Sequence, residues 1–137
     1  MSDDDTPPTG EPAIRVVAMP ADTNAYGDIF GGWLLGLMDQ AAGVVAARYS
    51  RGRAVTIALD GMTFHRPVRI GEVVSVYADL IHVGRTSMKI DVAAWRRVRN
   101  GEETEKVTHA VFTFVAIGED GRPRPIEARP IDQSKGV

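Results

Sequence analysis

MPADTNAYGDIFGGWLLGLMDQAAGVVAARYS, residues 19–50, is the stretch that decides the fold of this chain. It starts as a loop rich in turn-forming residues and changes character at the glycine pair Gly31 and Gly32. From residue 33 to residue 47 almost every position suits a helix, and apolar residues cover all its sides instead of one stripe. A helix that is apolar all round is a buried helix, so we expect the rest of the chain to wrap around it.

A carboxylate interrupts this apolar helix. Asp39, followed by Gln40, lies in the middle of the run, and an ionised carboxylate is costly to bury unless it is paired or hydrogen-bonded. Asp39 could face solvent at a boundary or cap a backbone amide, as is common for aspartate. The apolar neighbours favour the other interpretation, in which Asp39 points into a site as a general base or a nucleophile.

The glycine pair at the helix start is the second candidate. Gly31 and Gly32 could simply permit a tight turn, but they also leave the first helix amides open to a developing oxyanion. Eight residues at about 1.5 Å rise place Asp39 roughly 12 Å from Gly31, too far for both to hold one carbonyl. If both serve one reaction, Gly31 of one subunit faces Asp39 of another across a two-fold interface.

Composition limits the class of protein. The 137 residues suffice for one domain, and the absence of cysteine excludes disulfides, thiolate metal sites and a cysteine nucleophile. With 16 basic and 18 acidic residues, the net charge of -2 gives no reason to expect nucleic acid or a membrane as partner. No stretch is typical of a signal peptide or a spanning helix, so we expect a cytoplasmic protein.

β-strand patterns flank the helix. The expected order is one strand, the helix and four more strands with hairpin-length connections, which favours antiparallel pairing. The simplest architecture is α+β, with one long helix wrapped by a curved antiparallel sheet of about five to six strands. We expect a disordered arm at 1–12, a domain at 13–126 and a tail at 127–137. The strands are expected at 13–19, 54–64, 72–83, 86–97 and 106–117.

Four segments resemble one protein family. MPADTNAYGDIFGGWLLGLMDQAAG at 19–43, MTFHRPVRIGEVV at 62–74, VGRTSMKI at 83–90 and AVFTFVAIGEDGRPRPI at 110–126 are similar to the hotdog-fold acyl-CoA thioesterases, specifically the small bacterial YciA-type subgroup. This resemblance implies the hotdog fold and hydrolysis of acyl-CoA thioesters to free acid and CoA. It further implies no metal and no cofactor beyond the CoA of the substrate, a homodimer as the minimum active unit, and a trimer of dimers.

The resemblance also implies roles for single residues. Asp39 matches the family's catalytic carboxylate, acting as general base on water or as nucleophile. Asn24, Asp28, Gly31 and Gly32 match the loop and helix start that hold the thioester carbonyl from the other subunit.

A second set of residues matches the family's CoA contacts. Gly84, Arg85, Thr86 and Ser87 form a turn and strand start whose guanidinium and hydroxyls can serve phosphate or pantetheine groups. Arg66 could add a phosphate contact. Each arginine could equally be an ordinary surface charge.

Two other functions stay open on the residues alone. An acyl-thioester hydratase or dehydratase would need a histidine beside a carboxylate at the helix start, but Phe30 stands where related sequences often have histidine. A non-catalytic acyl-CoA-binding or sensing module would gain nothing from Asp39 beside an acyl chain. We expect His65, His82 and His109 to be structural, because none has a partner nearby in sequence.

Overall fold

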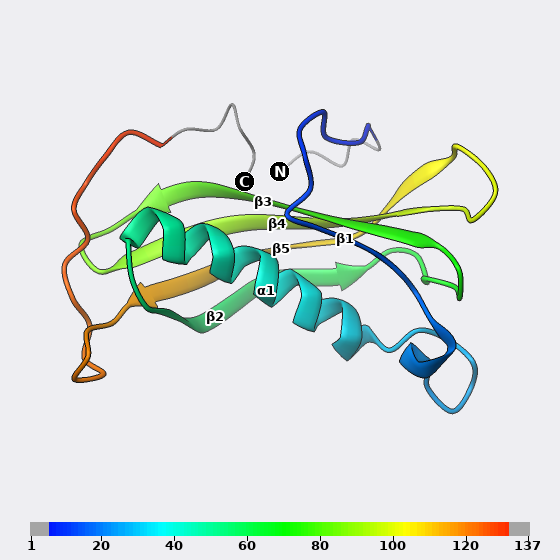
Figure 1. Ribbon diagram of the computed structural model, residues 1–137, viewed down its shortest axis with the longest axis horizontal. Coiled ribbons are helices and arrows are strands. Elements are labelled where there is room, and N and C mark those ends of the chain that lie inside the picture. Colours follow the sequence, from blue (N-terminus) through cyan, green and yellow to red (C-terminus); the bar gives the residue numbers. More distant parts are fainter. Residues whose placement is uncertain (1–5, 132–137) are drawn as a thin grey trace.

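A single antiparallel sheet carries one long helix, α1 (Gly31–Ser50), across one of its faces (Figure 1). This arrangement comes from a computed structural model that describes residues 6–131. The strand order is β1-β3-β4-β5-β2, and every neighbouring pair is antiparallel. The predicted α+β architecture is therefore confirmed. The strands are β1 (Ile14–Val17), β2 (Ala54–Phe64), β3 (Val73–Val83), β4 (Ser87–Arg97) and β5 (Thr104–Ala116).

The core lies between the sheet and one side of the helix. On β4, alternate residues such as Met88, Ile90 and Val92 are fully buried, as expected for a strand with one face against a helix. From the helix, Leu34 and Met38 pack into the same cluster. This alternation is the pattern that predicted the strands, and it explains why their bounds agree with the sequence to within about two residues.

The helix is buried on one side only within the single chain. Met38, Ala42 and Ala46 have no exposed surface, whereas Val44 is 47% exposed and Gln40 is also exposed. The sequence predicts burial on all sides because apolar residues occupy every side. The structure thus leaves an apolar helix side open, and a second protein surface would be needed to cover it.

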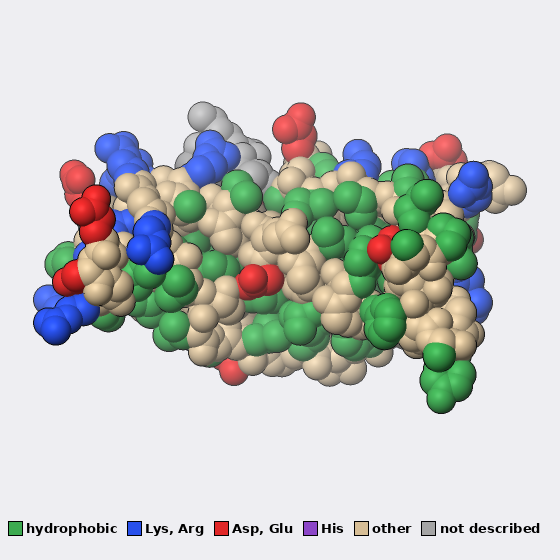
Figure 2. Space-filling model, turned by 60° about the horizontal axis from the view of Figure 1, so that its bottom comes forward, with side chains coloured by type: hydrophobic (Ala, Val, Ile, Leu, Met, Phe, Trp, Pro, Cys, Tyr) green, Lys and Arg blue, Asp and Glu red, His purple; other side chains and the backbone are tan. Residues whose placement is uncertain are grey.

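Strand β2 forms an edge of the sheet and adds to this open apolar surface. Within residues 6–131 no strand pairs with its outer edge, and Val55 and Ile57 are 39% and 59% exposed. Figure 2 shows hydrophobic side chains gathered along this face, with Lys and Arg mostly towards its ends and margins. A long apolar edge strand is a template for pairing with another chain.

The chain ends flank the domain. Residues 6–12 contain no helix or strand, and residues 1–5 and 132–137 lie outside the described part. Residues 127–131 also lack regular structure, although Arg129 packs on the ring of Tyr49 of α1 at 4.8 Å. The expected domain limits at 13 and 126 stay a prediction. Within residues 6–131, no helix is both long and apolar enough to cross a membrane.

Candidate active site

The loop before α1 is a compact structure held by its own polar groups. The side-chain Oδ1 of Asn24 accepts hydrogen bonds from the backbone amides of Tyr26 at 2.8 Å and Asp28 at 3.1 Å. The backbone amide of Asn24 donates to the carbonyl of Asp28 at 2.7 Å, and that of Phe30 donates to Asp22 at 3.0 Å. These bonds hold Asn24 and Asp28 in the loop that leads into the helix start, and the predicted role of both residues beside Gly31 stays a prediction.

The helix start itself is left uncapped. Phe30 is the N-cap residue and offers no side-chain hydrogen bond, so the first helix amides keep no acceptor from a cap. Gly31 and Gly32 are exposed, and a Cβ atom added to Gly32 would meet nothing within 4 Å. A Cβ atom on Gly31 would lie 3.3 Å from the Phe64 ring. The positive pole of α1 is therefore open to an incoming carbonyl oxygen.

A cavity of about 370 Å³ adjoins this helix start. Its wall is mostly apolar, with polar groups from His65 and Arg66. Such a pocket suits an apolar group with a polar end beside the free amides. The lining residues are Ile29, Phe30, Gly31, Leu34, Phe64, His65, Arg66, Pro67, Val68 and Val107.

Asp39 lies two turns further along the helix and faces β2. Its side chain is partly exposed, and its Oδ1 accepts a hydrogen bond from the hydroxyl of Thr56 at 2.5 Å. Within residues 6–131 Asp39 makes no ion pair. Sequence analysis did not single out Thr56. The signal available was a hydroxyl between the apolar residues Val55 and Ile57 of β2.

The turn predicted to contact CoA, between β3 and β4, lies at the opposite end of the molecule from the start of α1. The β3–β4 turn is on the side where α1 ends, whereas the glycine pair is where α1 begins (Figure 1). The turn is tight, because the amide of Gly84 donates to the carbonyl of Ser87 at 2.8 Å and a Cβ atom on Gly84 would lie 2.9 Å from the Ser87 hydroxyl. Arg85 is exposed, and no hydrogen bond or ion pair from its guanidinium is described. One chain therefore does not bring the two predicted sets of residues together.

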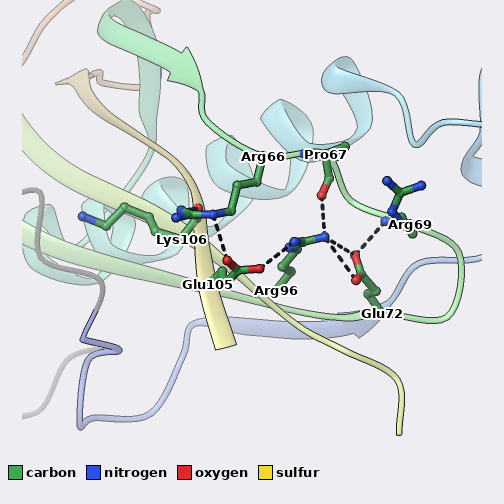
Figure 3. Close-up of polar contacts among 7 residues, drawn as sticks. All are labelled: Arg66, Pro67, Arg69, Glu72, Arg96, Glu105 and Lys106. Atoms are coloured by element: carbon green, nitrogen blue, oxygen red, sulfur yellow. Dashed lines mark hydrogen bonds and ion pairs between the residues drawn. The ribbon is translucent and has the colours of Figure 1, made fainter. Parts of the chain in front are cut away.

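Arg66 belongs to a network of charges that ties the β2–β3 connection to strands β4 and β5 (Figure 3). Its Nε lies 3.1 Å from Glu105 Oε2, and its Nη1 donates to the carbonyl of Lys106 at 2.8 Å. Arg96 joins Glu105 at 2.6 Å and Glu72 at 3.3 Å. The network anchors the β2–β3 connection that forms one wall of the cavity. The predicted phosphate contact of Arg66 stays a prediction, and Arg66 lies apart from the β3–β4 turn.

Burial and charge act in opposite directions on Arg96. Burial lowers the pKa of its guanidinium, but the hydrogen bond to Glu105 and the charge of Glu72 outweigh burial, so the pKa is raised. Arg96 therefore remains a cation between Glu72 and Glu105.

The histidines lie in different places. His109 Nε2 is 2.6 Å from Asp91 Oδ1 on the sheet face away from α1, and His82 is exposed. Asp91 also lies opposite Asp79, where burial first and the charge of Asp91 second raise the pKa of Asp79. His65 lines the cavity beside the helix start, and its backbone amide donates to the carbonyl of Val107 at 2.8 Å.

Comparison with known proteins matches this architecture to one family. Residues 26–102 match the model of the Thioesterase superfamily. The chain is 63% identical over 116 residues to an uncharacterised acyl-CoA thioester hydrolase of Zymomonas mobilis, covering 85% of this chain and 78% of that protein. It is 46% identical over 125 residues to the acyl-CoA thioester hydrolase YciA of Salmonella typhimurium, covering 89% of this chain and 94% of YciA.

A solved structure gives the same result. The crystal structure of a hexameric thioesterase from Yersinia pestis superposes with a TM-score of 0.84 at 45% identity, covering 89% of this chain and 99% of that one. The chain thus belongs to the thioesterase superfamily, with the α-helix and antiparallel sheet of the hotdog fold. Within that superfamily its relatives are the YciA-type acyl-CoA thioester hydrolases, as the sequence resemblance implied.

Proposed function

We propose that this protein hydrolyses acyl-CoA thioesters to a free carboxylic acid and CoA. The observation that carries this proposal is the uncapped start of α1, where two exposed glycines present free amides beside an apolar cavity. The family supports the reaction, because its named relatives are acyl-CoA thioester hydrolases. CoA enters only as part of the substrate and leaves as product.

The chemistry follows from the groups at the site. The amides of Gly31 and Gly32 bind the thioester oxygen and stabilise the negative charge that develops on it. Asp39 either takes a proton from water as the water attacks the carbonyl carbon, or attacks that carbon itself before water releases the acid. In both cases the carbon–sulfur bond breaks and the CoA thiolate leaves. A thioester is reactive enough that this carboxylate suffices without serine or cysteine.

The active unit in this proposal is a two-fold dimer. The open edge of β2 and the open side of α1 present apolar residues such as Val44, Val55 and Ile57 to a second copy. Antiparallel pairing of two β2 edges reverses the second chain, so that the helix start of one subunit lies towards Asp39 and the β3–β4 turn of its partner. Three such dimers would form a hexamer, and the thioesterase of Yersinia pestis is hexameric.

Release of free thiol from a panel of acyl-CoAs tests the reaction. We expect the wild-type protein to turn over substrate and Asp39→Asn to lose at least about a hundredfold in kcat while it still binds CoA. Asp120→Asn is the control, because Asp120 lies in the turn after β5 and not in the proposed site. The panel runs from short to long chains and includes aromatic acyl groups, and so defines the substrate class.

Two results would contradict the proposal. If the wild-type protein binds acyl-CoA without releasing thiol, the chain is a binding or sensing module. If Asp39→Asn retains full turnover, hydrolysis uses another group and the assignment of Asp39 fails.

A further inference from the structure

We propose that a small cavity on the sheet face away from α1 is a binding site for an oxyanion, that is, for a carboxylate or a phosphate group. The cavity has a volume of about 170 Å³, and its lining residues come from the N-terminal segment and from strands β1, β3, β4 and β5. It is separate from the proposed active site at the start of α1. The inference therefore goes beyond hydrolysis of acyl-CoA and does not depend on it.

A row of side chains across four neighbouring strands places this cavity on the sheet. Arg15 of β1 lies opposite Ser75 of β3, which in turn lies opposite Trp95 of β4. On the other side of Trp95 lies Lys106 of β5. None of these four residues belongs to the core cluster that includes α1, whereas the residues on either side of Ser75 do. Because successive residues of a strand point to opposite faces, the row lies on the face away from the helix.

The charges around the cavity are unbalanced. Three of the lining residues are arginines, and none is aspartate or glutamate. Arg96 lies between Glu72 and Glu105 (Figure 3), but no ion pair of the exposed Arg15 and Arg97 is described within residues 6–131. Two guanidinium groups without a carboxylate partner thus border one cavity. Guanidinium groups bind carboxylates and phosphates through pairs of parallel hydrogen bonds.

A buried donor without an acceptor is the second observation. Trp95 is 2% exposed, and its indole Nε1 is buried without a hydrogen-bond partner. A buried indole N–H normally has a partner, so this one calls for an explanation. In the same row, Arg15 is held in place because its Nε donates to the Ser75 hydroxyl at 2.8 Å. An oxyanion in the cavity would accept from both kinds of donor, whereas solvated surface arginines would not account for the unpaired indole.

The size of the cavity limits the ligand. A volume of about 170 Å³ is below the range of about 300–1,000 Å³ that is usual for sites of drug-sized molecules, so it suits a single carboxylate or phosphate group. Two sources have this chemistry. One is free phosphate. The other is the chain itself, because Asp3, Asp4 and Asp5 come shortly before the lining residue Pro7 in the sequence.

Fluorescence of Trp95 tests the site directly. The chain has two tryptophans, so Trp95 is the only one in a Trp33→Phe variant, which serves as the background for all measurements. Sodium phosphate is titrated at constant ionic strength, with sodium chloride as the balancing salt. We expect a saturable change in emission, with half-saturation between about 1 and 10 mM. Arg97→Gln and Arg15→Gln are each expected to raise the half-saturating concentration by at least about tenfold, because each removes a charge-assisted donor.

Arg99→Gln is the matched control. Arg99 is exposed and follows Arg97 closely on the chain, but it does not line the cavity. The substitution removes the same charge from the same end of β4, and half-saturation is expected to stay within about twofold. If Arg99→Gln weakens binding as much as Arg97→Gln, phosphate responds to the general charge of this surface and the proposal is wrong.

A variant in which Asp3, Asp4 and Asp5 are all changed to asparagine distinguishes the two sources. If these carboxylates compete for the cavity, the triple variant is expected to bind phosphate at least about tenfold more tightly than the parent. If free phosphate is the ligand, the two proteins bind it equally within about twofold. The proposal is overturned if neither the parent nor the triple variant shows a saturable change. Thiol release plays no part in these measurements, so their failure leaves the proposed function untouched.

Discussion

The two ends of α1 differ in whether side chains bind their free backbone groups. At its start, Phe30 provides no cap, two glycines stand exposed, and the amides point towards a cavity. At its end, side chains from the C-terminal segment bind the last carbonyls. Both ends of a helix have unsatisfied backbone groups, and capping either end stabilises the helix. This difference supports the proposal that the start of α1 receives the thioester oxygen.

The capped end is held by two arginines. Arg124 Nη1 donates to the carbonyl of Ser50 at 3.0 Å, and Arg129 Nη2 donates to the carbonyl of Tyr49 at 2.5 Å. The Tyr49 hydroxyl in turn donates to the carbonyl of Arg129 at 2.6 Å. Arg51 adopts a left-handed conformation, with φ of 57°, that ends the helix. Positive side chains near the negative pole add to this stabilisation.

The difference between the two ends of α1 fits a general trade-off between the stability of a protein and its function. A helix start without a cap gives up stability that serine, threonine, aspartate or asparagine would supply, and proteins keep such sites where a ligand takes the place of the cap. A substitution at the start of α1 is therefore expected to lower activity without lowering stability, and one at its end to lower stability with little effect on activity.

Gly32→Ala has the largest expected effect. A Cβ atom at this position meets nothing within 4 Å in the single chain, and alanine is a better helix former, so the free energy of unfolding is expected to stay equal or rise by about 0.5 kcal/mol. The methyl group lies where the thioester oxygen must approach, so kcat/KM is expected to fall by about a hundredfold. Thermal unfolding and thiol release measure the two quantities. An active and more stable Gly32→Ala would mean that the glycine serves only the turn.

Mixed subunits test whether the open end of one helix works with Asp39 of the partner. Co-expression of Gly32→Ala and Asp39→Asn chains in equal amounts yields half heterodimers, and each heterodimer has one intact shared site, so activity should return to about a quarter of wild type. The thiol-release rate of the mixture is compared with that of each variant alone. If mixing restores nothing above the two parents, both groups act within a single chain.

Arg124→Ala is expected to have the smallest effect on activity and a clear effect on stability. It removes hydrogen bonds to the carbonyls of Ser50 and Ile117, which lie at 3.0 Å and 3.1 Å, so the free energy of unfolding is expected to fall by about 2 kcal/mol. The value of kcat should change by less than about twofold, because the capped end takes no part in the reaction. Urea unfolding measures the loss. Arg122→Ala, an exposed neighbour, is the control and should be neutral.

The sequence predicted the fold well because periodicity carries most of that information. The alternation in residues 86–97 predicted β4 to within one residue, and the apolar run at 33–47 predicted α1 to within three residues at each end. Asp39 and the glycine pair stood out because a carboxylate and two glycines are unusual in such a helix. Their roles stay predictions, because the chemistry of the site depends on a second subunit.

Other features could not be predicted because they depend on contacts between residues far apart in the chain. Thr56 meets Asp39 only through the bulge at Ile57, and Arg124 reaches Ser50 from 74 positions away. The open side of α1 was also missed, since an apolar helix pattern does not say which side the chain's own sheet covers.

The sequence by itself determined the α+β architecture, the presence of the one long helix and the family, because these depend on local propensity, on the period of apolar residues and on matching motifs. Only the tertiary structure decided that the start of α1 stays uncapped while its end is bound by arginines, and that Asp39 meets a threonine hydroxyl. The reason is physical: a cap, a bulge and a hydrogen bond across two elements form only when the packed backbone brings distant groups within about 3 Å.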